Sequence, residues 1–282
     1  MEANRKLFIM NYEEVAKMEF FDSHAHLDDE KFNEDRENLI NSLKEAEITK
    51  CISAGYSLEV SQKAINLAKQ YEFIYATCGI APSDILQTED ELWKDIAKIE
   101  KIVKENQTEK KKIVVAIGEI GLDYYWEKDE ERRNMQKKVF IEQIKLANQL
   151  ELPIVIHTRD AIMDTIEILK NHEVKHKGVF HCCPQNRELI KEALKLGFYI
   201  SFAGPITFKN SKNAEEMINL VPNDRILIET DSPYLAPEPV RGTRNDPRNV
   251  KYVANKIAVS KGLSLEEVSY MTFENACKIF CI

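Results

Sequence analysis

Two histidines stand one residue apart in the stretch FFDSHAHLDD, which runs from Phe20 to Asp29. The whole chain has only six histidines, so this pair concentrates a scarce side chain. On a β-strand, residues i and i+2 point to the same side, so His24 and His26 would direct two imidazoles toward one point. Imidazole is a common metal ligand, although an H-x-H triplet also arises by chance on solvated strand ends.

Further side chains of metal-binding type follow other strand-like runs, each at its C-terminal end: Glu119, His157, His181 and Asp231. Taken singly, a histidine here could be a core residue bonded to a backbone carbonyl. Glu119 lies between glycines and apolar residues in AIGEIG, where an unpaired carboxylate would be costly. The two remaining histidines, His172 and His176, lie in KNHEVKHKG and are expected to be exposed. We therefore predict that the six candidate ligands converge.

Six ligands exceed the needs of one zinc ion, since a catalytic zinc usually takes three protein ligands and keeps one position open. The set predicts two divalent ions, Mg, Mn or Zn, about 3.5–4 Å apart, with Glu119 as the bridging carboxylate. The other ligands divide into one group for each ion: His24, His26 and Asp231, and then His157 and His181.

Formal charge indicates the class of substrate. Two dications against two carboxylates leave a positive site, which suits a phosphodiester better than a neutral amide. The expected reaction is hydrolysis by a metal-activated water, with Asp231 steering that water. The same metals polarise carbonyls, so a carboxylic ester or amide, such as an aminoacyl ester on tRNA, is the alternative substrate. A third possibility is a non-catalytic protein that keeps metal for stability.

Eight short runs rich in β-branched and aromatic residues must position these ligands: EFFDSH, KCISAG, FIYATCGI, KIVVAIGEIG, PIVIHT, GVFHC, FYISFAG and RILIETD. They are almost continuously apolar, which is typical of parallel strands covered on both faces. Segments with helical periodicity lie between them, at 36–46, 58–71, 89–104, 130–150, 161–171 and 187–196. The alternation predicts an α/β fold, a TIM-type (β/α)8 barrel in a single domain, whose strand ends form one rim. An open doubly wound sheet is the alternative, although no G-x-G-x-x-G follows the first run.

Composition excludes several classes of protein. The 282 residues are 44% hydrophobic and 30% charged, as in globular proteins. A net charge of −8 argues against a protein that coats a long nucleic acid, so phosphate binding must be local. No apolar run approaches the roughly 18 residues of a membrane span. The six cysteines include no C-x-x-C pair and are typical of buried thiols, which predicts a cytoplasmic protein; no obligate protein partner is indicated.

The chain resembles the TatD family of metal-dependent hydrolases, within the amidohydrolase-like barrels. The resemblance runs from about Phe20 to Phe280 through DSHAHLD, AIGEIGLDYY, IHTRDA, HCC, ISFAGPITFKN, LIETDSPYLAPEPVRGTRNDP and TFENACKIF. It implies a divalent-metal nuclease, generally a deoxyribonuclease that works from the 3′ end of DNA and possibly of RNA, with the six ligands named above. We expect residues 1–17 to be an N-terminal extension and 18–282 to form the hydrolase barrel.

Two segments depart from the family pattern. Ala81 in GIAPSD replaces a histidine of the usual G-x-H-P, and HCCPQN stands where the family reads H-C-F-S/T-G. Neither change removes a ligand. Glu119 takes the place at which related amidohydrolases carry a carbamylated lysine, and Lys111 and Lys112 would lie at the opposite end of the barrel.

Basic residues near the rim are candidates for phosphate binding: Arg159, Lys209, Arg241 and Arg244. The alternative for Arg159 is an ion pair with Asp160. The aromatic residues 124–126 could stack on bases or pack in the core, and no role is assigned to them.

Overall fold

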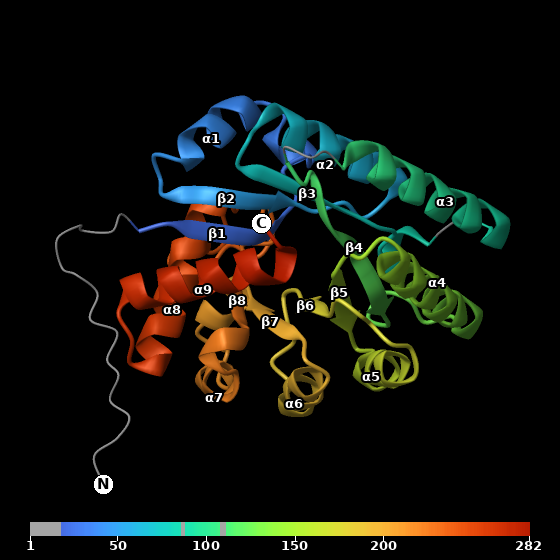
Figure 1. The fold of residues 1–282 in the computed structure, drawn as a ribbon. Helices are drawn as coiled ribbons and strands as arrows, with labels where there is room; N and C mark the ends of the chain where they lie inside the picture. Colours follow the sequence, from blue (N-terminus) through green and yellow to red (C-terminus); the bar gives the residue numbers. More distant parts are fainter. Residues whose placement is uncertain (1–17, 86–87, 108–110) are drawn as a thin grey trace, which may run out of the picture.

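The computed structural model describes residues 18–85, 88–107 and 111–282, so the predicted extension 1–17 lies outside the described residues. Eight parallel strands pair in sequential order (Figure 1): β1 (Phe20–Ala25), β2 (Ile48–Ser53), β3 (Ile74–Cys78), β4 (Val114–Asp123), β5 (Ile154–Arg159), β6 (Gly178–Phe180), β7 (Tyr199–Phe202) and β8 (Ile226–Ile228). Sequential pairing curls the sheet into a nearly closed barrel. The predicted TIM-type fold is confirmed, and the doubly wound sheet, which needs a reversal of strand order, is excluded.

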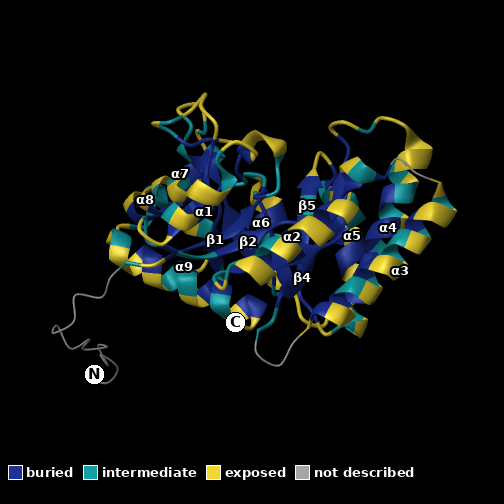
Figure 2. Ribbon diagram, turned by 90° about the horizontal axis from the view of Figure 1, so that it is seen from above, coloured by how far each residue is buried: buried dark blue, intermediate teal, exposed yellow. Residues whose placement is uncertain are grey.

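Helices surround this sheet and present their exposed faces outward, while the strands in the middle are buried (Figure 2). They are α1 (Arg36–Leu43), α2 (Leu58–Gln70), α3 (Glu89–Asn106), α4 (Glu130–Gln149), α5 (Ile162–Asn171), α6 (Arg187–Lys195), α7 (Ala214–Leu220), α8 (Val250–Lys261) and α9 (Leu265–Phe280). All six predicted helical segments are present. The repeat differs from the prediction at its end, where β8 is followed by two long helices, α8 and α9, in place of one.

Side-chain caps fix where several helices begin. The Asp129 carboxylate accepts a hydrogen bond from the Arg132 amide at the start of α4, and Asn186 does the same for α6. Ser264 and Glu267 form a reciprocal capping box at the start of α9. These caps satisfy amides that have no partner within their own helix.

The two ends of the barrel interior differ in chemistry. At the amino end, every strand contributes one inward apolar side chain to a single layer: Phe21, Ile52, Tyr75, Val115, Val155, Val179, Tyr199 and Leu227. Ala276, Ile279 and Phe280 of α9 pack on this layer and plug that end. The carboxyl end therefore remains for polar groups.

A side-chain seam joins the first strand to the last. In the described part of the chain, strand pairing runs from β1 to β8 without returning to β1. The buried Asp22 carboxylate accepts hydrogen bonds from the Thr230 amide at 2.9 Å and the Thr230 hydroxyl at 2.5 Å. Ser23 donates to the Ile228 carbonyl at 2.9 Å. These bonds hold the two edges of the sheet together.

No helix within 18–85, 88–107 and 111–282 is both long enough and apolar enough to cross a membrane. All six cysteines are free thiols, and Cys51, Cys78 and Cys183 are buried.

Candidate metal centre

The six predicted ligands meet at the carboxyl end of the barrel. Glu119 lies at their centre: one carboxylate oxygen is 3.5 Å from Nε2 of His24, and the other is 2.8 Å from Nδ1 of His157 and 3.2 Å from Nε2 of His181. One oxygen of the carboxylate therefore faces His24 and the other faces His157 and His181. The imidazoles adjoin one another, because the rings of His24 and His181 stack with centroids 4.0 Å apart. That these residues bind metal remains a prediction.

Asp231 completes the group on the β1 side. Its Oδ1 lies 3.2 Å from Nε2 of His26 and 3.8 Å from Nε2 of His24. The Asp231 amide donates to the His24 carbonyl at 2.9 Å, and its φ of 55° lies in the left-handed region, which Asp tolerates better than most side chains. The backbone thus turns sharply just after β8 and aims the carboxylate back at the histidines of β1.

Glycines explain how Glu119 reaches this position. The prediction placed Glu119 at the end of a strand, but β4 continues to Asp123 and pairs closely with β5. A Cβ at Gly118 would lie 2.6 Å from Cβ of Val155, and one at Gly121 would lie 2.0 Å from the His157 carbonyl oxygen. Glycine on either side of the glutamate therefore permits a close approach that any larger residue would block.

Two further carboxylates, absent from the predicted set, orient the histidines. Oδ2 of Asp123 lies 3.0 Å from Nε2 of His157, and Oε1 of Glu229 lies 3.3 Å from Nδ1 of His181. Each imidazole thus has one nitrogen held by a carboxylate and the other directed at Glu119, a common arrangement around metal-binding histidines. The sequence carried a signal for both: Asp123 is the last residue of β4 and Glu229 directly follows β8, so each is a carboxylate at a strand end, as the predicted ligands are.

The electrostatics of the site follow from burying opposite charges together. Burial would raise the pKa of Glu119, but His181, His157 and His24 hold it well below its usual range. Burial would lower the pKa of His181, but Glu119 and Glu229 raise it well above the ordinary value. The pKa of His24 is instead lowered by burial.

The donor atoms fit divalent metal. Three overlapping sets of donors each lie within 4.8 Å of one another: His24, His26 and Glu119; Glu119, His157 and His181; His24, His181 and Asp231. Both ring nitrogens of His24 and Nδ1 of His26 are buried without a hydrogen-bond partner. Buried polar atoms usually have a partner, and a cation held by one nitrogen of His24 together with Glu119 would supply one.

The charge balance differs from the one expected. Asp123 and Glu229 join Glu119 and Asp231, so four carboxylates, not two, lie around the histidines. Two dications would bring the net formal charge of this group to zero, whereas the sequence predicted a positive site. Attraction of an anionic substrate therefore depends more on the residues of the surrounding rim.

The candidate phosphate-binding residues are in different situations. Arg159 makes no ion pair with Asp160 or with another carboxylate in the described ranges; its guanidinium carbon lies 3.8 Å from the centre of the Tyr125 ring. Arg241 packs on Phe208 at 4.1 Å, and Lys209 is exposed. Arg244 is engaged in the fold, because it pairs with both carboxylate oxygens of Asp35 at 2.7 and 2.6 Å.

The structure also shows where four other residues singled out in the sequence lie. Ala81 is buried, and its amide donates to the Tyr56 carbonyl. Lys111 lies at the amino end of the barrel, where its ammonium donates to carbonyls of Ala68, Tyr71 and Ile74. His176 is exposed and His172 partly so.

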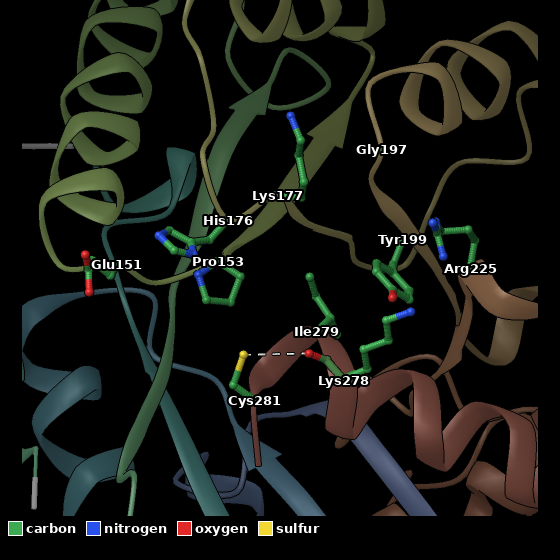
Figure 3. A pocket seen from close by; sticks show the side chains of 10 residues that line it. All are labelled: Glu151, Pro153, His176, Lys177, Gly197, Tyr199, Arg225, Lys278, Ile279 and Cys281. Carbon is green, nitrogen blue, oxygen red and sulfur yellow. Dashed lines mark hydrogen bonds between the residues drawn. The ribbon is translucent and has the colours of Figure 1, made fainter.

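A separate cavity of about 230 Å³ lies at the amino ends of the strands, remote from the six ligands (Figure 3). On the wall of the cavity, the Lys278 side chain extends toward Tyr199 and Arg225. The Cys281 thiol donates a hydrogen bond to the Lys278 carbonyl. None of the candidate ligands lines it.

Comparisons with known proteins identify the family of the chain. A family model described as TatD related DNase matches residues 21–281. The chain is 43% identical over 263 residues to the metal-dependent hydrolase YabD of Bacillus subtilis, covering 93% of this chain and 99% of that protein. It is 36% identical to YcfH of Escherichia coli, covering 93% and 95%. The crystal structure of YJJV, a TatD homologue from Escherichia coli, superposes with a TM-score of 0.84 at 25% identity, over 93% of this chain and 98% of that one. The chain therefore belongs to the TatD family of metal-dependent hydrolases.

Proposed function

We propose that this protein is a divalent-metal-dependent nuclease that hydrolyses phosphodiester bonds at nucleic acid ends, as a deoxyribonuclease working from the 3′ end. The observation that carries the proposal is the position of Glu119, one of whose oxygens faces His24 while the other faces His157 and His181. A carboxylate between two donor groups suits a pair of metals, and such pairs serve where attacking and leaving oxygens both need stabilisation. The description of the matching family as a DNase supports the choice of substrate.

The residues would divide the work as follows. Glu119 would bridge the two ions, with His24, His26 and Asp231 on one and His157 and His181 on the other. When bound, the ions supply Lewis-acid stabilisation of phosphate oxygens and a water of lowered pKa. Asp231 would orient that water and accept its proton, and the 15% exposure of its side chain supports this role.

An end-labelled oligonucleotide tests the proposal. We expect metal-loaded protein to shorten a 5′-labelled single strand into a ladder and to release mononucleotide from a 3′-labelled one, and a chelator to abolish both. The matched variant Glu119→Gln keeps the shape of the side chain and removes its charge; its rate should fall by about a hundredfold or more. Intact oligonucleotide with Mg, Mn and Zn would contradict the nuclease.

The same assay separates the alternatives. Release of amino acid from aminoacyl-tRNA beside intact oligonucleotide would assign an ester hydrolase. The Asp231→Asn variant tests the non-catalytic alternative. Equally slow turnover by wild type and variant, at equal metal content, would indicate a protein that keeps metal only for stability.

A further inference from the structure

Two large aromatic side chains are exposed at the mouth of the barrel. They follow β4 in the turn that leads to α4, at the right of Figure 1. Tyr125 is 43% exposed and Trp126 is 70% exposed, and their rings meet edge to face with centroids 4.7 Å apart. Single exposed aromatic residues are common on protein surfaces, so what points to a ligand here is that two such rings adjoin each other beside the candidate metal centre. The core-packing alternative for these two residues is therefore wrong, whereas Tyr124 is buried.

A cation is stacked on this aromatic pair. The guanidinium carbon of Arg159 lies 3.8 Å from the Tyr125 ring centre and 5.7 Å from that of Trp126. Arg159 has no carboxylate within ion-pair distance in the part of the chain that the structure describes. Its charge is thus available to a ligand, while its planar group is held in place by the ring.

One carboxylate ties this surface to the metal centre. Oδ1 of Asp123 accepts hydrogen bonds from the amides of Tyr125 at 2.9 Å and Trp126 at 3.2 Å. Oδ2 of the same side chain holds His157 at 3.0 Å. The backbone also connects them, because the Tyr124 amide donates to the Arg159 carbonyl at 2.8 Å. The aromatic pair is therefore fixed relative to a candidate metal ligand.

Charge around the mouth favours this side for an anionic chain. Next to His26, Tyr56 has its pKa raised to about 12 by burial and by nearby carboxylates, those of Asp28, Asp84 and Asp29. Those carboxylates would repel phosphate. In the aromatic turn, two cations, Lys128 and Arg159, lie over the Tyr125 ring. The carboxylates of Glu127 and Asp129 in the same turn keep their charge and accept hydrogen bonds from backbone amides near the start of α4.

We propose that Tyr125, Trp126 and Arg159 form a stacking ledge that binds a nucleobase and its adjacent phosphate in a single-stranded nucleic acid next to the scissile end. The ledge deepens the nuclease proposal and rests on it. Aromatic faces bind any base, and a base must be unpaired to lie on one. The ledge therefore selects single-stranded or frayed ends over intact duplex.

The chain has two tryptophans, so a Trp93→Phe background leaves Trp126 as the sole indole fluorophore. Metal-loaded protein is titrated with oligothymidylate carrying phosphorothioate linkages, which resist hydrolysis, and with an abasic chain of equal length. We expect the thymidine chain to quench Trp126 emission and the abasic chain to leave it nearly unchanged.

Affinity is then compared by anisotropy of a labelled oligomer. Trp126→Ala should weaken binding of the thymidine chain by about 5- to 150-fold. Trp126→Phe should restore most of the lost affinity. The affinity for the abasic chain should be the same in all of these variants. The matched control is Tyr270→Ala, which removes another exposed aromatic from α9. Equal affinity of Trp126→Ala and Tyr270→Ala, or equal quenching by both chains, would overturn the ledge.

The two proposals fail in different ways. Quenching and base-dependent affinity without cleavage would leave the ledge standing and contradict the nuclease. Cleavage by Trp126→Ala with unchanged KM for single strands would leave the nuclease standing and remove the ledge.

Discussion

Asp123 links two tasks through its two oxygens. One orients the ring of His157, and the other holds the amides of Tyr125 and Trp126. Because a carboxylate that orients a metal-binding histidine usually contributes a substantial part of metal affinity, its removal should be felt at the metal centre although it is not a predicted ligand.

We predict that Asp123→Asn lowers metal affinity by about 10- to 100-fold. An amide cannot supply the negative charge that raises the basicity of His157. Affinity is measured by competition with a coloured chelator, and Asp160→Asn serves as the control, since it removes an exposed carboxylate one residue beyond β5. Equal affinities in the two variants would show that Asp123 does not support the metal centre.

Protons compete with metal for the histidine nitrogens, and this competition gives a second prediction about single residues. In the metal-free protein the pKa of His157, which burial would lower, is raised by Asp123 and Glu119, and that of His181 is raised by Glu119 and Glu229. These imidazoles stay protonated to higher pH and must release protons when they bind metal. Metal affinity should therefore fall as pH decreases, by up to about tenfold per pH unit for each proton released. Calorimetry in buffers of different ionisation enthalpy counts those protons; a count of zero would contradict the ligand assignment.

The sequence predicted the candidate metal ligands, but it did not predict the two carboxylates, those of Asp123 and Glu229, that orient the histidines. His24, His26, Glu119 and Asp231 were predicted because an imidazole or carboxylate directly after an apolar run is conspicuous. Asp123 and Glu229 were not, because their role depends on which neighbouring strand presents the partner nitrogen, and the sequence does not show that.

At the scale of elements, the strands were predictable because each is apolar on both faces, a pattern that follows from being covered by helices outside and by side chains inside. The residues at which the strands end were less predictable. β4 extends past Glu119 to Asp123 because Gly118 and Gly121 allow it to approach β5, and pairing of this kind leaves no periodic signal. Periodicity also says nothing about closure, which here involves individual hydrogen bonds such as those from Thr230 to Asp22 and from Ser23 to the Ile228 carbonyl.

We predict that Thr230→Val lowers the free energy of unfolding by about 1–3 kcal/mol. The valine keeps the shape but removes the hydroxyl that donates to Asp22, a carboxylate whose pKa is already raised by burial. Urea unfolding measures the change. Thr243→Val, on an exposed loop, should stay within about 0.5 kcal/mol of wild type. If the two variants unfold at the same urea concentration, the seam contributes nothing beyond the backbone bonds around it.

On the scale of the whole molecule, the candidate metal centre joins residues from five strands or their ends, so metal should stabilise the entire barrel. At a free metal concentration a hundred times Kd, one site contributes about 2.7 kcal/mol. For a domain of this size that corresponds to a rise in Tm of about 5 °C. Calorimetry with and without chelator measures it, and Glu119→Gln should respond much less. A Tm indifferent to chelator in the wild type would contradict metal binding at this site.

Overall charge sets the last expectation. A chain with a net charge of −8 repels a polyanion at long range, so binding must come from a few contacts at the rim. Each phosphate contact on a single strand contributes about −0.7 to the slope of log affinity against log salt. If Arg159, Lys209 and Arg241 each contact one phosphate, the slope should be about −2, and Arg159→Ala should reduce its magnitude by about 0.7. Arg244→Ala should leave the slope unchanged, because Asp35 already neutralises that guanidinium. Anisotropy titrations of a short single strand at several salt concentrations decide this. A slope much steeper than −2, or one that responds to Arg244→Ala as strongly as to Arg159→Ala, would mean that the nucleic acid follows a different path across the rim.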